Sequence, residues 1–297
     1  MALAFVTFAV AQLVYTTRAG KSIGVAVRFA RSHPREIVVL NVLTLSSWLF
    51  MFMALQRIEA SVESAIFQGV VALGGFLLAT VWSGQRFGVA ARVGVLAATA
   101  ALGLLVLARL SQTLSAPKHD ASALVGVVLA LIAGASGALY IHYSSALHSR
   151  TEVSANTVLC LRFVLLLMVT GAASAGETLK LLESDQGTIL RLLALSVAFV
   201  VVPTFLLQFA IARLPSVRVS VATPFVAVIA LGSEYAVRPW GNIAVPVLVL
   251  AASAALVFTN VALSSDLARS AFLSPRNEEN PAPAPAMVPD TQGETRS

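Results

Sequence analysis

The sequence predicts an all-α integral membrane protein, and three observations lead to this fold class. Of its 297 residues, 58% are hydrophobic and 11% are charged, and the mean hydropathy is +0.85. A soluble domain of this length does not need so much apolar surface. Apolar segments of about 20 residues, the length that crosses a hydrocarbon core, recur between short polar breaks. These runs are continuous, whereas the strands of a membrane barrel alternate apolar and polar residues.

Nine segments qualify as transmembrane helices, each bounded by polar or charged residues. They are expected at residues 2–17, 36–55, 60–82, 88–108, 123–147, 155–176, 189–212, 217–237 and 242–263. The first is short, about 24 Å at the helical rise against a core of about 30 Å. We interpret it as a retained span, because no basic segment precedes it as one does in a signal peptide. The Pro-rich tail, 269–297, is predicted to be disordered and cytoplasmic.

The positive charges predict the orientation, because short cytoplasmic loops collect Lys and Arg. The loop after the first segment carries five of them, and threading the chain from there places ten on one side and six on the other. Residue 1 is therefore expected outside and the C-terminus inside. This orientation accounts for the pI near 10.1 without a nucleic-acid partner. The Ala- and Val-rich composition fits a bacterial inner membrane, and a eukaryotic organelle is the alternative.

An internal repeat relates residues 1–110 to residues 123–263. A shift of 156 positions pairs Ala54 with Ala210, Arg57 with Arg213 and Ser64 with Ser220 without a gap. The first part then holds four helices and the second five, and the helix 123–147 has no counterpart. Two repeats of five must be inverted, because an odd number of crossings turns the second copy over. We therefore expect that the first helix is missing, either through start-site choice or in a naturally shortened relative.

Several residues resemble motifs of the EamA-type branch of the drug/metabolite transporter superfamily. In the second half these are Ala212-Arg213-Leu214, Pro224 and Glu234, and in the first half Ala54-Leu55-Gln56-Arg57 and Gln85. The sequence departs from the pattern at Gln68, where proline is common, and at Gln85, which replaces an acid. The resemblance covers residues 1–263. It implies ten helices in two inverted repeats, a central cavity, and export of small metabolites such as amino acids without ATP hydrolysis.

Candidate substrate-binding residues are polar or aromatic side chains that lie within the spans and four positions apart, so that each pair shares a helix face. Four pairs are repeat mates, because adding 156 to positions 48, 52, 64 and 68 gives 204, 208, 220 and 224. Ordinary hydrogen bonding between helices is the alternative. The candidates are Trp48, Phe52, Ser64, Gln68, Ser136, Tyr140, Thr204, Gln208, Ser220 and Pro224.

Ionisable groups inside a span are costly and often functional. Arg162 lies about seven residues into the segment 155–176, where it could bind a substrate anion or a neighbouring helix, or snorkel to the interface. Glu234 could bind substrate or a proton, or pair with Arg238 one turn later. Glu63 could be a coupling carboxylate, or it could be exposed at the interface.

The sequence holds no constellation typical of an enzyme. Gly134-Ala135-Ser136-Gly137 resembles a rhomboid protease motif, but His142 and His148 follow on the same helix, so close helix packing explains the motif better. The lone Cys160 and the histidine spacing predict neither metal nor other cofactor. We expect a secondary carrier of small metabolites that works by alternating access in the bilayer. A non-transporting scaffold and an unrecognised membrane enzyme are the alternatives, and a homodimer stays open.

Overall fold

The computed structural model describes residues 2–19, 23–82, 84, 87–114, 121–182, 186–222 and individual positions between 243 and 265. Every regular element in these ranges is helical. Four helical segments are long and apolar enough to cross a membrane: Pro34–Leu55, Val62–Val81, Ser122–Thr151 and Ala155–Gly176, the last of which combines the helix Ala155–Leu161 with most of the following helix. The expected all-helical class is therefore confirmed for the described residues, four of whose helical segments could span a membrane. The nine spans and their repeat stay predictions.

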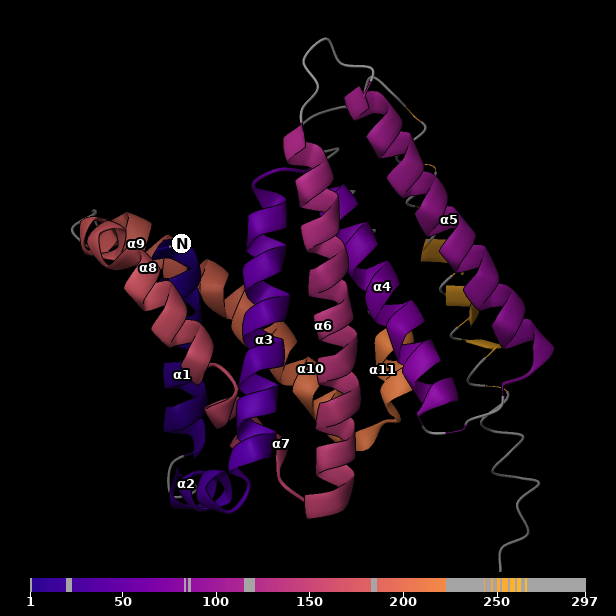
Figure 1. The fold of residues 1–297 in the computed structure, drawn as a ribbon. Helices are drawn as coiled ribbons and strands as arrows, with labels where there is room; N and C mark the ends of the chain where they lie inside the picture. Colours follow the sequence, from indigo (N-terminus) through magenta and orange to yellow (C-terminus); the bar gives the residue numbers. More distant parts are fainter. Residues whose placement is uncertain are drawn as a thin grey trace, which may run out of the picture.

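The described elements follow one another with short connections (Figure 1). They are α1 (Ala2–Ala19), α2 (Ile23–Ser32), α3 (Pro34–Leu55), α4 (Ala60–Val81), α5 (Val89–Leu114), α6 (Ala121–Thr151), α7 (Ala155–Leu161), α8 (Val164–Leu182), α9 (Gln186–Ser196), the π-helical turn η2 (Val197–Val201), α10 (Val202–Arg213) and α11 (Ser216–Ala222).

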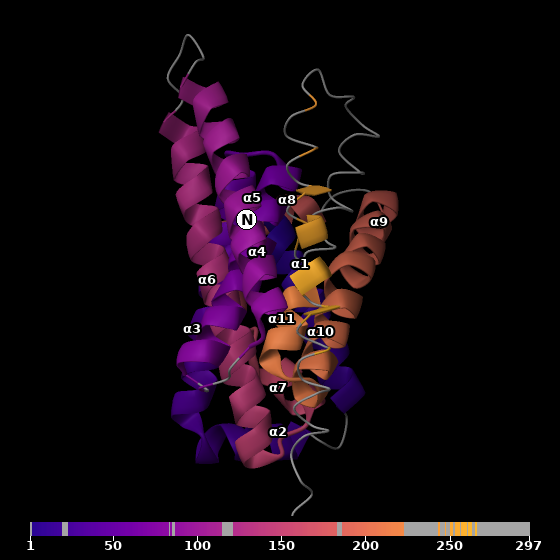
Figure 2. The same cartoon turned by 90° about the vertical axis from the view of Figure 1, so that its right-hand side faces the viewer.

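The centre of the bundle is formed by α6, which packs along both α3 and α4 (Figures 1 and 2). Small residues bring these helices close together. A Cβ atom added to Gly134 would lie 2.7 Å from the Cβ of Val70, and one added to Gly137 would lie 3.1 Å from a methyl group of Val71. The two glycines of the protease-like motif therefore lie against α4. Elsewhere α1 packs on α8, and α11 packs on α4.

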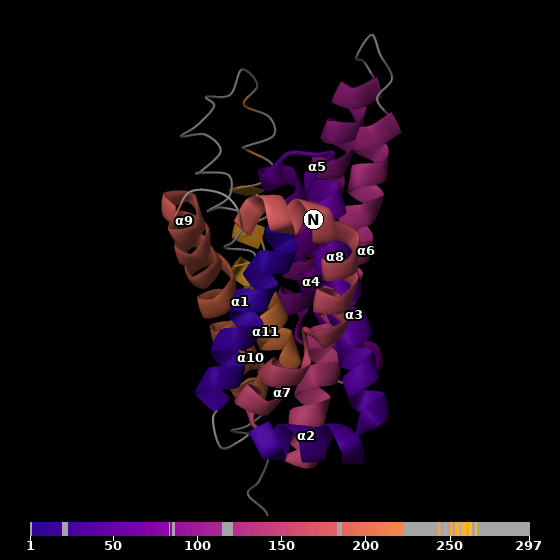
Figure 3. The same ribbon diagram turned by 90° about the vertical axis from the view of Figure 1, so that its left-hand side faces the viewer.

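Helix α2 was not expected, because its residues were assigned to the first loop. It lies across the lower end of the bundle (Figure 3). Ala26 is buried there and Phe29 is partly buried, whereas Arg28 and Arg31 are exposed. Ala26 and Phe29 are three positions apart, a spacing that indicates an amphipathic helix. This spacing was missed because the basic residues of this segment were interpreted as a loop.

Two of the expected spans are not continuous helices. The segment 155–176 breaks between α7 and α8, and the segment 189–212 contains the π-helical turn before α10. Pro203 stands at the start of α10, where it supplies no backbone N–H to the turn before it. Such turns mark places where a helix can bend.

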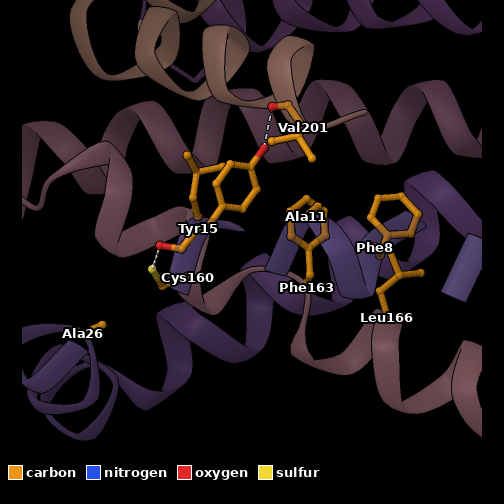
Figure 4. Close-up of a cluster of buried hydrophobic side chains, with 9 residues drawn as sticks. Phe8, Ala11, Tyr15, Ala26, Cys160, Phe163, Leu166 and Val201 are labelled. Atoms are coloured by element: carbon orange, nitrogen blue, oxygen red, sulfur yellow. Dashed lines mark hydrogen bonds between the residues drawn. The ribbon is translucent and has the colours of Figure 1, made fainter. Parts of the chain in front are cut away.

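An aromatic cluster joins α1 to both irregular segments (Figure 4). Phe8 and Phe163 are fully buried, with ring centroids 5.1 Å apart. The Tyr15 hydroxyl donates to the Val201 carbonyl at 2.6 Å, and the Cys160 thiol donates to the Tyr15 carbonyl at 3.4 Å. The helix α1 thereby packs against η2 through a hydrogen bond as well as through apolar contact.

Gly75 tests how tightly α4 and α11 pack. A Cβ atom added there would lie 2.5 Å from the Cβ of Ser220, so Gly75→Ala forces the helices apart and should destabilise the fold by about 1–3 kcal/mol. Gly103→Ala is the matched control, because no atom lies within 4 Å of the added carbon. That change should stabilise α5 by up to about 1 kcal/mol. Thermal unfolding in detergent measures both, and equal effects would contradict the close approach.

Candidate functional site

A cavity of about 340 Å³ lies where α3, α4, α6 and α10 meet the break between α7 and α8. This volume is at the lower end of the range for small-molecule sites. Its walls are mainly apolar and include Trp48, Met51, Phe67 and Leu207. The polar side chains that line it are Thr44, Ser47, Gln68, Tyr140, Arg162 and Thr204. A mostly apolar cavity with a few converging polar groups is typical of a binding site for a small organic molecule.

Arg162 is the charged residue of this lining, and its side chain is only 4% exposed. Its guanidinium carbon lies 4.2 Å from the ring centre of Tyr140 and 4.8 Å from that of Phe163. Its Nη1 donates to the Gln208 side-chain oxygen at 3.3 Å. The snorkelling interpretation was therefore wrong. It assumed a continuous helix near the interface, whereas Arg162 lies in the break and its side chain points inward.

The break beside Arg162 is held open by two side-chain amides. In a continuous helix the Leu165 N–H would donate to the Leu161 carbonyl. Asn41 of α3 lies between these groups instead: its Oδ1 accepts from the Leu165 N–H at 3.0 Å, and its Nδ2 donates to the Leu161 carbonyl at 2.8 Å. Gln12 of α1 donates to the neighbouring Cys160 carbonyl at 2.6 Å. Insertion of a side chain into the hydrogen-bond ladder is a recognised cause of a kink.

Gln208 connects the lining to a second layer of polar groups. Its side-chain oxygen accepts from the Tyr140 hydroxyl at 2.5 Å and from Arg162. Its Nε2 donates to the Ser144 hydroxyl at 3.0 Å and contacts Nε2 of His148 at 2.9 Å. A glutamine amide has two donor and two acceptor sites. All four are in use, so this fully buried side chain is fixed in one orientation.

The hydrogen bonds of His148 define its protonation state. Its Nδ1 lies 2.7 Å from the Val153 carbonyl, which can only accept, so Nδ1 carries the proton. Its Nε2 then accepts from the Gln208 amide. The neutral imidazole therefore fits this network, whereas a second proton on Nε2 would face the amide donor.

Five of the twelve predicted site residues line the cavity, and a sixth bonds to two of them. The sixth, Gln208, contacts Tyr140 and Arg162. The lining members come from α3, α4, α6, the break and α10, and are Trp48, Gln68, Tyr140, Arg162 and Thr204.

The other predicted residues lie elsewhere. Phe52 packs one turn from Trp48 in the aromatic cluster, with ring centroids 5.9 Å apart. Ser64 on α4 and Ser136 on α6 are buried but outside the lining, and Ser220 is buried where α11 meets Gly75. Pro224 and Glu234 fall outside the residues that the structure describes.

Two further observations concern charged groups. Glu63 is only 3% exposed, so the interpretation that it is exposed at the interface was wrong. It belongs to a helix whose first turn packs into the bundle. Among the residues with described positions, no group of three His, Cys, Asp or Glu side chains gathers as a metal site.

Sequence reasoning missed Asn41, Ser144 and His148. Ser144 and His148 continue the α6 face of Tyr140 at intervals of four, so extending the spacing rule by two turns would have found them. Asn41 shares a face with Thr44 and Trp48 on α3. Its role depends on the backbone of a helix 120 positions away, which no local pattern indicates.

No family model matches the chain, and no curated protein matches it. A solved structure, the crystal structure of a protein, is similar in fold, with a TM-score of 0.60 and 17% sequence identity. The similarity covers 91% of this chain and 88% of the other. At this identity it shows a shared fold and nothing about function, so membership of the EamA-type family stays a prediction.

Replacing Gln208 tests the polar network. Gln208→Leu keeps the volume but leaves the Tyr140 hydroxyl, Arg162 and His148 without this partner. Each buried polar group left unpaired costs about 1–3 kcal/mol, so we expect a loss of about 3 kcal/mol or more. Gln208→Glu retains acceptors toward Tyr140 and Arg162, so its loss of stability should be smaller. SDS titration followed by circular dichroism compares them, and wild-type stability of Gln208→Leu would show that the network does not stabilise the fold.

Replacing Asn41 tests the helix break. In Asn41→Leu, the Leu165 N–H and the Leu161 carbonyl either stay unpaired, at about 1–3 kcal/mol each, or bond directly and straighten the helix. We expect the groups to stay unpaired, and therefore a lower melting temperature in detergent, because the packing of α1 and α3 holds the break in place. Thr44→Val, one turn away, removes a hydroxyl oxygen that bonds to no described residue. Its stability should equal or exceed that of the wild type, and a similar loss in both variants would contradict the bridging role of Asn41.

Proposed function

We propose that this chain is a secondary carrier of small metabolites, such as amino acids, that exports them by alternating access, as its resemblance to EamA-type transporters implies. The observation that carries the proposal is the position of the cavity. Its lining comes from α3 and α4 in the first part of the chain and from α6, the α7–α8 break and α10 in the second. A site between two repeats is the arrangement on which alternating access depends.

The expected repeat receives support from the helix positions. Helix α4 begins at Ala60 and α11 begins at Ser216, which is the shift of 156 deduced from the sequence. Corresponding helices also contact each other, since α4 packs on α11 and α1 packs on α8. Trp48 and its mate Thr204 both line the cavity. These relations are those expected of two repeats arranged around one axis.

The irregular helices offer places where the repeats could bend. The turn η2 and Pro203 precede the lining residue Thr204 on α10, and the break precedes α8. Helices interrupted near a site are common in secondary transporters. Rocking of one repeat against the other would expose the cavity to each side in turn.

We also propose that residue 1 faces outward and that the C-terminus is cytoplasmic, in a bacterial inner membrane. Exposed arginines lie on α2, at the start of α3 and at the end of α6, all of which are at the lower end of the bundle in Figure 1. Short cytoplasmic segments are rich in such residues. The arginines that support this orientation are Arg28, Arg31, Arg35 and Arg150.

A substitution that fills the cavity tests whether the protein is a carrier. Ser47→Phe places a ring in the lining, so counterflow of any transported metabolite in proteoliposomes should fall at least tenfold. Ser46→Phe is the matched control, because this neighbouring serine is not part of the lining, and its flux should stay near that of the wild type. The screen covers amino acids, small carboxylates and amines. If the folded wild type moves none of them, the non-transporting scaffold replaces the carrier.

A further inference from the structure

Among the described residues, the buried cation of Arg162 has no matching anion. Arginine keeps its charge in proteins, and a guanidinium removed from water is costly unless a counter-charge and hydrogen bonds compensate. In the part of the chain that the structure describes, the ionisable side chains that act on Arg162 are the phenols of Tyr140 and Tyr15, which are uncharged at neutral pH, and no carboxylate pairs with it. The faces of Tyr140 and Phe163 and one long bond to a neutral amide offset only part of that cost.

Buried polar atoms without a hydrogen-bond partner belong to residues that line the same cavity. Nε of Arg162, Oγ1 of Thr44 and Oε1 of Gln68 are buried without a partner among the described residues, and all three residues line the cavity. Buried polar atoms normally have partners, so unpartnered atoms around one hollow indicate a ligand. Arg162 and the Thr44 hydroxyl offer donors, and Gln68 offers an acceptor.

The rest of the lining limits the chemistry of that ligand. One cation favours one negative charge, because a dianion such as phosphate would leave a second charge uncompensated among apolar walls. The planar guanidinium matches a carboxylate, which can accept two of its N–H groups. The aromatic and aliphatic side chains of Trp48, Met51, Phe67 and Leu207 suit an apolar body.

We propose that the cavity binds a small organic acid with an apolar body, whose carboxylate pairs with Arg162. This inference deepens the proposed function by naming the class of substrate. The carboxylate supplies the counter-charge that the described residues lack, and the Thr44 hydroxyl donates a further hydrogen bond to it. Gln208 keeps the guanidinium in place from the other side through its oxygen.

Ligand binding is measured in detergent, without a gradient, so the result does not depend on transport. The reporter is Trp48 in a background of Trp82→Phe and Trp240→Phe; Trp82 is 73% exposed. The probes are butyrate, hexanoate, benzoate and phenylacetate, each compared with its amide and with the amine of the same carbon skeleton. We expect at least one carboxylate to change Trp48 fluorescence and to bind at least tenfold more tightly than its amide and amine.

Variants of Arg162 complete the test. Arg162→Gln should lose the preference for the carboxylate over the amide while the melting temperature without ligand does not fall, because an uncompensated buried charge is removed. Arg162→Lys should keep the preference for the carboxylate but bind it more weakly. It provides the test of Arg162 if Arg162→Gln does not fold. Arg150→Gln, an exposed site outside this cavity, should bind as the wild type does.

The outcomes separate this inference from the carrier. If no carboxylate binds more tightly than its amide, or if the preference survives in Arg162→Gln, the inference is wrong even where counterflow of other metabolites is observed. Carboxylate binding that depends on Arg162, with no flux of the bound acid, would support the inference and contradict the carrier. Tighter binding of the amines would assign the cavity to cations and overturn the role of Arg162.

Discussion

The arrangement around the cavity depends on a side-chain amide that replaces one backbone hydrogen bond of a helix. The Asn41 amide stands between the Leu161 carbonyl and the Leu165 N–H, where a continuous helix would bond to itself. In an apolar surrounding each unpaired backbone group costs several kcal/mol, so a membrane helix can break only where other groups take over its bonds. Asn41 and Gln12 provide them from two different helices. The break is therefore possible only because α1 and α3 pack on both sides of it.

The break decides where the charge of Arg162 lies. On an uninterrupted helix a long basic side chain reaches toward the interface, which lowers its cost. At the break it turns inward against Tyr140 and Gln208. Gln208 in turn has its four hydrogen-bonding sites occupied, so it cannot rotate away without leaving several groups unpaired. The position of the cation follows from two amides: Asn41 opens the helix, and Gln208 holds the side chain.

Composition was sufficient to predict a helical membrane protein, because continuous apolar runs have few other solutions. The spacing of four was only partly informative: Trp48 lines the cavity, whereas Phe52, four positions on, packs in the aromatic cluster. Arg162 was misjudged because depth along a helix was counted as though the helix were straight. The function of Asn41 was hidden for a related reason: it acts on the backbone of a distant helix, and backbone groups leave no trace in a sequence pattern.

The two walls of the cavity are held in different ways. Tyr140, Ser144, His148, Arg162 and Gln208 all belong to the second part of the chain, and their hydrogen bonds join α6, α10 and the break into one unit. On the opposite wall, no hydrogen bond between described residues ties Thr44, Ser47 or Gln68 to that unit, and these residues contact it by packing, whereas Asn41 on the same helix α3 bonds to the break. Packed apolar surfaces can slide or part without leaving polar groups unpaired, whereas a bonded network cannot. A carrier that rocks would therefore open along the face of α3 and α4, with the Asn41 bridge as the point at which that face stays attached.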